Sequence, residues 1–181
     1  MRVDALPALP AELLDEAWDF YHETFAPLAV HAVQRHVLHR GEFDGLMADR
    51  RVTKYVARGG GTVVGLSAMT ADLSTLPLLS PEFFAHRWPD LYAQQRILYC
   101  MFVGVHSGPP GKGVFVALQR EMYKQVEALR GMVVLDICAY NEAELGLPWA
   151  IESILTPIAG GAFATRLDSQ SYWLYEFPAV S

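Results

Sequence analysis

The sequence predicts an α/β fold in which helices flank a mixed central β-sheet. Strand-like and helix-like segments alternate over residues 97–155, which implies parallel strands joined by a right-handed crossover. Hairpin-like strand pairs at 52–69 and 162–177 add antiparallel neighbours. The chain has 181 residues, of which 52% are hydrophobic, so it is long enough for one domain with a sizeable core. We expect a single domain over 1–181, with an insertion between strands at 71–95.

Two helical stretches and a short third helix are expected before the sheet. From Pro10 to Phe25, apolar residues recur at three- and four-residue steps, which places them on one helical face. Pro27 interrupts the pattern, and a second helical stretch follows it. A short helix over 43–50 then leads into the sheet. The second stretch has Val30, Val33 and Val37 on one side, and His31, Arg35, His36 and His39 on the other.

An antiparallel hairpin and a long connection come next. Residues 52–57 are β-branched and aromatic, a run of three glycines supplies a turn, and 62–69 reads as the return strand. The connection over 71–95 contains Ser80, a suitable helix cap, followed by a proline at the first helical position. We therefore expect a short helix over 83–88, ended by the proline that follows it.

The middle of the chain predicts two buried strands and two helices. Residues 97–105 are apolar almost throughout, which is typical of a strand covered on both faces. A second apolar strand is expected at 132–140, and a helix at 142–155. The helix between the two strands should end at Gly131, as helices commonly do at a glycine. Its apolar stripe consists of Phe115, Leu118, Met122, Val126 and Leu129.

The end of the chain reads as one more hairpin. Strands are expected at 162–167 and 172–177, on either side of a turn at 168–170.

Composition limits the classes of partner. The net charge is −6 and the pI is about 5.4, which disfavours general binding to nucleic acid or an anionic membrane. Cys100 and Cys138 lie in apolar runs, so we expect two reduced thiols rather than a disulfide or a thiolate metal site. The N-terminus does not resemble a signal peptide, and no apolar run reaches the ~18 residues that span a membrane. These features predict a cytoplasmic protein.

The loop between the first buried strand and its helix carries the clearest chemical signal. It contains Gly108, Gly111, Lys112 and Gly113 directly before a helix N-terminus. Backbone N–H groups there have no partner within the helix, and the helix dipole favours negative charge. Glycine lets the backbone approach a phosphate closely. The loop therefore indicates a phosphate or pyrophosphate site, with a plain strand-to-helix turn as the alternative. It matches neither a Walker loop nor a complete dinucleotide fingerprint.

The run from Val105 and His106 to Gly111-Lys112-Gly113-Val114 resembles motif A of the GNAT acyltransferase superfamily, and the order of elements is similar over most of the chain. The resemblance implies that the loop binds the pyrophosphate of acetyl-CoA or a longer acyl-CoA. It also implies that the strand pairs with the pantetheine arm. Pro110, which lacks an N–H, and the bulky Phe115 depart from the motif. The implied cofactor residues are Phe102, Val103, Gly104, Val105, Gly108, Gly111, Lys112, Gly113, Val114, Phe115 and Asn141.

The insertion is loosely similar to that of N-acyl amino acid synthases within the superfamily, which would imply an acyl group longer than acetyl. Phe83 and Phe84 could then line an acyl pocket, although packing of a helix on the sheet explains them as well. In the GNAT fold the first two helices border the acceptor site, so Arg35, His36 and His39 could contact the acceptor. A solvated helix face is the alternative, and no third ligand accompanies the two histidines to indicate a metal.

Three residues are candidate catalysts for acyl transfer to an amine. Tyr99 occupies the strand position that often holds a glutamate base in the family, but it could be a half-buried aromatic. Asp136 lies in a predicted apolar strand, where it could be a base or a structural partner. His106 ends the central strand and could face the cofactor. Cys100 has no neighbouring base to activate it. Pro148 stands where the family often has a tyrosine acid.

These features predict an acyl-CoA-dependent N-acyltransferase in which a small-molecule amine attacks the thioester directly. A non-catalytic member that binds acyl-CoA as a sensor or interaction module is the alternative, and a fold relic used only in assembly is a third. We expect no metal cofactor, and a homodimer remains open.

Overall fold

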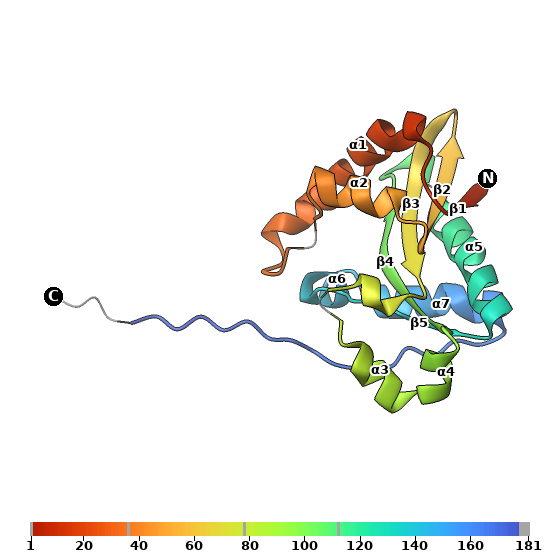
Figure 1. The fold of residues 1–181 in the computed structure, drawn as a ribbon. Coiled ribbons are helices and arrows are strands. Elements are labelled where there is room, and N and C mark those ends of the chain that lie inside the picture. The colour runs from red at the N-terminus through yellow and green to blue at the C-terminus, as the bar shows by residue number, and fades with distance from the viewer. Residues whose placement is uncertain (1, 36, 78, 112, 178–181) are drawn as a thin grey trace.

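The computed structural model describes residues 2–35, 37–77, 79–111 and 113–177. Its centre is a five-stranded sheet in the order β1-β2-β3-β4-β5 (Figure 1). The first four strands are antiparallel neighbours, and β5 runs parallel to β4. The predicted mixed sheet is therefore confirmed. The strands are β1 (Val3–Leu6), β2 (Val52–Gly59), β3 (Thr62–Thr70), β4 (Ile97–Val105) and β5 (Met132–Val134).

Helices cover both faces of this sheet. The alternation of side chains along β2 shows this directly, because Tyr55 and Ala57 join the cluster under α5 (Val114–Leu129), whereas Val56 joins the cluster under α1 (Leu14–Phe25). On the α1 side, the aromatic rings of α1 pack with Phe43 of α2 (Arg40–Ala48). The interior is thus divided into two layers by the sheet. The second layer is built largely from Val114, Leu118 and Met122 of α5.

The N-terminal part differs from the sequence prediction in three ways. The first strand, β1, was missed because it has only four residues before Pro7. The second helical stretch is wrong: a 3-10 turn over Ala26–Val30 is followed by irregular chain, and Val30 is 84% exposed. Val33 is also exposed, and of the three valines only Val37 packs against the core, so this segment lacks the packing that stabilises a short helix. The third helix, α2, begins three residues earlier than expected.

A buried lysine ties the start of the chain to the sheet. Lys54 of β2 is fully buried, and its Nζ donates to the carbonyls of Pro7 (3.2 Å), Val52 (2.8 Å) and Asp49. Burial lowers the pKa of Lys54 to about 8. The three carbonyl acceptors satisfy the three donors of the ammonium group, which removes the penalty of unpaired polar atoms.

The insertion forms a small layer of its own around the start of β4. It contains a 3-10 turn (Leu73–Thr75), α3 (Pro81–Arg87) and α4 (Pro89–Ala93). Ser80 caps α3 by accepting the N–H of Phe83 (3.4 Å), as its sequence predicts. Pro89 ends the first short helix but also begins the next, because proline suits the first turn.

The chain after β5 departs most from the prediction. The strand expected at 132–140 ends at Val134, and the helix expected at 142–155 is divided into α6 (Ala139–Ala143) and α7 (Leu147–Ala159). Gly146, with φ of +56°, provides the left-handed turn between them. The final hairpin is wrong: residues 161–177 are extended without strand partners, and in Figure 1 they run past α3 and away from the sheet.

Candidate functional site

The glycine loop has a geometry that only glycine permits. A 3-10 turn over Pro109–Gly111 closes through a hydrogen bond from the N–H of Gly111 to the carbonyl of Gly108 (3.1 Å). A Cβ on Gly111 would lie 1.7 Å from the carbonyl oxygen of His106, so any side chain there would force the backbone apart. Gly108 and Gly113 have φ values of +89° and +77°, in the left-handed region. Lys112 lies outside the described residues.

The glycine loop leads directly into α5. Gly113 is the N-cap, and the first intrahelical bond runs from the N–H of Ala117 to the carbonyl of Gly113 (3.0 Å). The preceding N–H groups, those of Val114, Phe115 and Val116, therefore have no acceptor within the helix. The buried Val114 side chain packs so tightly on Gly65 of β3 that a Cβ there would lie 2.4 Å from it. This contact fixes the position of the helix N-terminus relative to the sheet.

The strand before the loop has an open edge. Parallel pairing between β4 and β5 extends only from Ile97 to Tyr99 on β4. On the other side, the register of β4 against β3 shifts so that Met101 is an extra residue, which makes it a β-bulge. From this bulge to Val105, β4 has no strand neighbour on its β5 side among the described residues.

The ladder with β3 determines which backbone groups face that edge. The N–H of His106 donates to Val64 (2.9 Å), and alternation along an antiparallel pair then directs the groups of Gly104 and Phe102 toward β3. The hydroxyl of Ser67 also donates to the carbonyl of Phe102 (2.8 Å). The main-chain groups of Val103 and Val105 therefore face the open edge. Of the four strand residues expected to contact pantetheine, these two have the suitable orientation.

Tyr99 and Asp136, both expected as catalysts, are brought together where β4 and β5 separate. The Tyr99 hydroxyl donates to Oδ1 of Asp136, which follows the end of β5. Burial, together with the neighbouring carboxylate, raises the pKa of Tyr99 above its usual range, so its phenol stays protonated. Tyr99 is thus unsuited to the role of base. Asp136 is exposed rather than buried in a strand, which corrects the expected location of its side chain.

His106, the third candidate, lies away from this pair. It lies seven positions after Tyr99 along extended chain, which corresponds to roughly 20 Å at about 3.3 Å per residue. Its Nδ1 lies 2.5 Å from the carbonyl oxygen of Ser107. The structure therefore places His106 in the loop, at the opposite end of the open edge. Cys100 is no alternative nucleophile, because burial raises the pKa of its thiol to about 12.

The segment expected to border an acceptor is held in place by ion pairs and aromatic contacts. Arg35 binds Glu42 through two hydrogen bonds (2.6 and 2.7 Å), and Glu42 also accepts the N–H of His39 (2.7 Å). His39 is therefore the N-cap of α2 and not a residue in the middle of a helix. His36, the other histidine expected to contact the acceptor, lies outside the described residues. Arg35 is thus already engaged by a carboxylate of its own chain.

This segment also contacts the elements that follow β5. The ring of His31 stacks on Tyr140 of α6, with ring centroids 4.1 Å apart and an interplanar angle of 10°. The hydroxyl of Tyr172 donates to Oε1 of Gln34 (3.3 Å). Asn141, expected near the cofactor, is the next residue of α6. The acceptor-side segment and α6 therefore meet beyond the end of β5.

The two phenylalanines of the insertion have different surroundings. Phe84 is buried in a cluster with Leu73, Leu76 and Ile97, whereas Phe83 is partly exposed on the same helix. Their rings meet edge to face, with centroids 5.3 Å apart. Phe84 is a core residue that fixes α3 to the start of β4, so its side chain is not available to line an acyl pocket.

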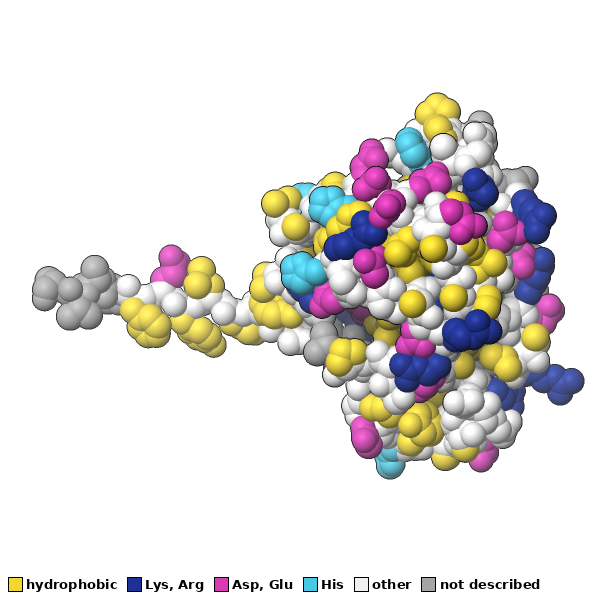
Figure 2. Space-filling view, turned by 45° about the horizontal axis from the view of Figure 1, so that its top comes forward, with side chains coloured by type: hydrophobic (Ala, Val, Ile, Leu, Met, Phe, Trp, Pro, Cys, Tyr) yellow, Lys and Arg dark blue, Asp and Glu magenta, His cyan; other side chains and the backbone are white. Residues whose placement is uncertain are grey.

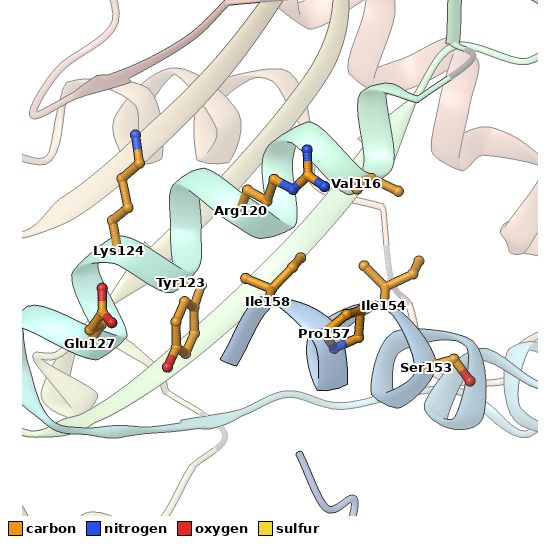
Figure 3. Close-up of a pocket in the computed structure, with 9 residues that line it drawn as sticks. All are labelled: Val116, Arg120, Tyr123, Lys124, Glu127, Ser153, Ile154, Pro157 and Ile158. Atoms are coloured by element: carbon orange, nitrogen blue, oxygen red, sulfur yellow. The ribbon is translucent and has the colours of Figure 1, made fainter. Parts of the chain in front are cut away.

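A groove between α5 and α7 was not predicted from the sequence. It has a volume of about 560 Å³ and contains Arg120 and Lys124 on its α5 wall, with Ile154 and Ile158 on the α7 wall (Figure 3). Lys124 also pairs with Glu121 (2.6 Å). Basic residues spaced by four on α5 were the available signal, but the position of α7 could not be derived from its sequence. Val116, which also lines the groove, lies in the N-terminal turn of α5 that follows the glycine loop.

The described part of the chain offers neither a cluster of metal ligands nor a helix that could span a membrane. Within these residues, no group of three or more His, Cys, Asp or Glu side chains is arranged to hold a metal ion. Likewise, none of the described helices is long and apolar enough to cross a membrane. Both cysteines are free thiols, as expected.

Several solved structures with a similar fold are named as acetyltransferases. A ribosomal-protein-alanine N-acetyltransferase from Brucella melitensis biovar Abortus 2308 is 20% identical, with a TM-score of 0.54 over 96% of this chain and 99% of that one. A possible acetyltransferase from Clostridium difficile 630 is 14% identical, with a TM-score of 0.57 over the full length of both. An aminoglycoside acetyltransferase from a soil metagenomic sample, in complex with sisomicin, is 10% identical over 97% of this chain and 96% of that one, with a TM-score of 0.56.

No protein-family model and no curated protein sequence matches the chain. The likeness is therefore one of fold, carried by nearly complete coverage at low identity. The chain has the fold of the GNAT acyltransferases, a mixed sheet flanked by helices, which here has five strands.

Proposed function

We propose that this protein is an N-acetyltransferase that transfers the acetyl group of acetyl-CoA to a small amine. One observation carries the proposal. The open edge of β4, from the bulge at Met101 to Val105, leads from the Tyr99–Asp136 pair to the glycine loop and the N-terminus of α5. An extended molecule that ends in a pyrophosphate would fit here, because its chain can lie along the strand edge and its negative charge can meet the helix N-terminus.

Each part of acetyl-CoA has a matching region on the chain. The main-chain groups of Val103 and Val105 would pair with the amides of the pantetheine arm. The N–H groups that begin α5 would bind the pyrophosphate, although Pro110 contributes none. The α5–α7 groove, with Arg120 and Lys124, would hold the nucleotide end. Acetyl-CoA itself supplies the activated thioester.

The chemistry would take place beside the Tyr99–Asp136 pair. Asp136, held by the Tyr99 hydroxyl, would accept the proton of the ammonium group, directly or through one water. The amine nitrogen then bonds to the thioester carbonyl carbon and the carbon–sulfur bond breaks. The nitrogen loses its second proton in this step, so that of the two protons one goes to the leaving thiolate and the other passes to solvent. A backbone N–H at the bulge would donate to the carbonyl oxygen as negative charge develops on it.

The site favours an acetyl group as the acyl group and a small amine as the acceptor. Acetyl suits the site better than a long chain, because Phe84 is part of the core and not of a pocket. The solved structures with this fold include enzymes named for ribosomal-protein alanine and for aminoglycosides, both of which present amines. A small amine is the acceptor class we propose, and the acidic surface of a chain with net charge −6 is compatible with a cationic acceptor.

The test is a thiol-release assay with acetyl-CoA and a panel of primary amines that includes aminoglycosides and amino-terminal peptides. We expect amine-dependent release of CoA with at least one class. A titration that shows acetyl-CoA binding with no turnover on any amine would instead support the non-catalytic member, which is also consistent with Pro148 at the place of the usual acid. Absence of both binding and turnover would contradict the proposal in either form.

A further inference from the structure

Ser67 is a polar residue in a largely apolar layer of the core. It lies on β3 and is fully buried, and its hydroxyl oxygen is 3.3 Å from the sulfur of Met122 on α5. Burial of a hydroxyl costs free energy unless the group is hydrogen-bonded. This hydroxyl donates to the main-chain carbonyl of Phe102 on β4 (2.8 Å). A buried side chain therefore holds a backbone group of the strand that has the open edge.

The carbonyl of Phe102 lies where the pairing of β3 with β4 is irregular. The bulge residue Met101 directly precedes Phe102, and the register between the two strands shifts there. Ser67 is paired with the following residue, Val103, so its side chain lies beside the peptide unit that joins Phe102 to Val103. The sulfur of Cys100 also lies 3.8 Å from the Phe102 oxygen. Side chains from both strands thus converge on this one carbonyl.

The peptide unit between Phe102 and Val103 connects this buried contact to the open edge. The described peptide bonds include no cis bond, and a trans peptide is planar, with its C=O and its N–H pointing in opposite directions. Because Ser67 holds the C=O on the β3 side, the N–H of Val103 points away from β3. The buried hydroxyl therefore controls the direction of a donor that it does not itself contact.

No strand supports this peptide unit from its other side. The pairing of β5 with β4 ends at Tyr99, and within the described residues no other strand lies beside Val103. In Figure 2 the end of the described chain projects from the body of the molecule, and it adds no strand to this edge. The direction of the Val103 N–H therefore depends on the contacts made from the β3 side, which include the hydrogen bond from Ser67.

We propose that Ser67 is a positioning residue for the pantetheine arm of acetyl-CoA. By holding the carbonyl of Phe102, it directs the N–H of Val103 toward the pantetheine amide that this N–H would bind. A donor held in its binding direction beforehand gives tighter binding than one that must be reoriented. The inference rests on the proposed function, because it requires acetyl-CoA at the open edge. Loss of the hydroxyl should weaken binding of the pantetheine part and not of the nucleotide part.

NMR titration of the isotope-labelled full chain with two ligands tests this role. One ligand is acetyl-CoA, and the other is the adenosine bisphosphate part of CoA, which lacks the pantetheine arm. Ser67→Ala should weaken acetyl-CoA binding about three- to tenfold, the effect of one misaligned hydrogen bond, and leave the affinity for the bisphosphate unchanged. The amide proton resonance of Val103 should also shift less on addition of acetyl-CoA than it does in the wild type.

Thr70→Val is the matched control. The Thr70 hydroxyl is also buried on β3 and donates to a main-chain carbonyl, but this carbonyl belongs to Arg51, directly before β2 (2.9 Å). Its loss should leave both affinities and the Val103 resonance as in the wild type. Ser67→Cys keeps a weaker donor in nearly the same volume, so it should lie between the wild type and Ser67→Ala. Thermal melting verifies that each variant is folded.

The results separate the role of Ser67 from the proposed function. A wild-type chain that does not bind acetyl-CoA would contradict the proposed function and the inference with it. If the wild type binds acetyl-CoA, and Ser67→Ala binds it equally well with the same shift at Val103, only the role of Ser67 is overturned. Equal weakening of both ligands in Ser67→Ala would also overturn that role, because the effect would then be a general loss of structure.

Discussion

At the scale of single residues, the contact between the Tyr99 phenol and the Asp136 carboxylate suggests different roles for these two candidate catalysts. Both were identified from the sequence, but their contact was not, because they lie 37 positions apart and meet only through the pairing of β4 with β5. The raised pKa of Tyr99 leaves Asp136 as the group able to accept a proton. In the proposed mechanism Asp136 is therefore the base, and Tyr99 is its positioning partner.

Substitution of these two residues should separate the roles. Asp136→Asn should lower kcat by about 10²–10⁴-fold, the usual contribution of general base catalysis, and leave the Kd for acetyl-CoA unchanged. Tyr99→Phe should lower kcat by roughly ten- to a hundredfold through misplacement of the carboxylate. Tyr92→Phe, in the same apolar cluster, is the matched control. Equal activity of Asp136→Asn and the wild type in steady-state kinetics would remove Asp136 from the mechanism.

Gly111 is the residue at which loop geometry is most strictly determined. Gly111→Ala places a Cβ against the His106 carbonyl, 1.7 Å from its oxygen, so the loop must shift. Calorimetric titration should show acetyl-CoA affinity reduced by about tenfold or more. Gly41→Ala is the control, because a Cβ there meets no atom within 4 Å. Unchanged affinity in Gly111→Ala would show that acetyl-CoA does not contact this loop.

At the scale of elements, sequence periodicity was informative where packing is regular. The helix α5 and the strand β4 occur where the apolar pattern placed them, since both are long and covered by other elements. The stretch after Pro27 was misjudged because its valines have helical spacing, but Val30 and Val33 face solvent and only Val37 packs against the core. The run over 132–140 was also misjudged: apolar residues favour a strand, but β4 offers a partner for only three of them.

The N-terminus of α2 is stabilised by a network of hydrogen bonds among Arg35, His39 and Glu42. Glu42 accepts hydrogen bonds from Arg35 and from the N–H of His39, and the Arg35 guanidinium holds the pKa of Glu42 at about 2, below its ordinary value of 4.5. A carboxyl with a depressed pKa stabilises the folded state above its unfolded pKa, and this stabilisation is lost as the pH falls from about 4.5 to about 2.

Glu42→Gln should therefore lower stability at neutral pH and flatten the loss of stability in acid. Urea unfolding at several pH values between neutral and strongly acidic conditions measures both effects. The exposed Glu12 provides the control, Glu12→Gln, since it lies in another element. If Glu42→Gln retained the full acid dependence of the wild type, the network would not contribute to folding in the way described.

At the scale of the whole molecule, the sequence indicated the fold class and the order of most elements, and the structure confirms the mixed sheet with helices on both faces. It could not indicate the end of the chain. The residues at 162–177 have a hairpin pattern, but a strand forms only where a neighbouring strand is available, and the last described residues point outward. The groove between α5 and α7 was likewise invisible, because it depends on how two helices pack.

The central claim is that acetyl-CoA binds along the open edge of β4, from the point where β4 and β5 separate to the glycine loop. Hydrogen exchange of the backbone amides, measured with and without acetyl-CoA, tests this claim most directly. The account predicts slower exchange at Val103, at Val105 and in the first turn of α5, with no change in β1 or α2. Exchange slowed elsewhere, or unchanged at these amides while calorimetry detects binding, would place acetyl-CoA outside the proposed site and contradict the account.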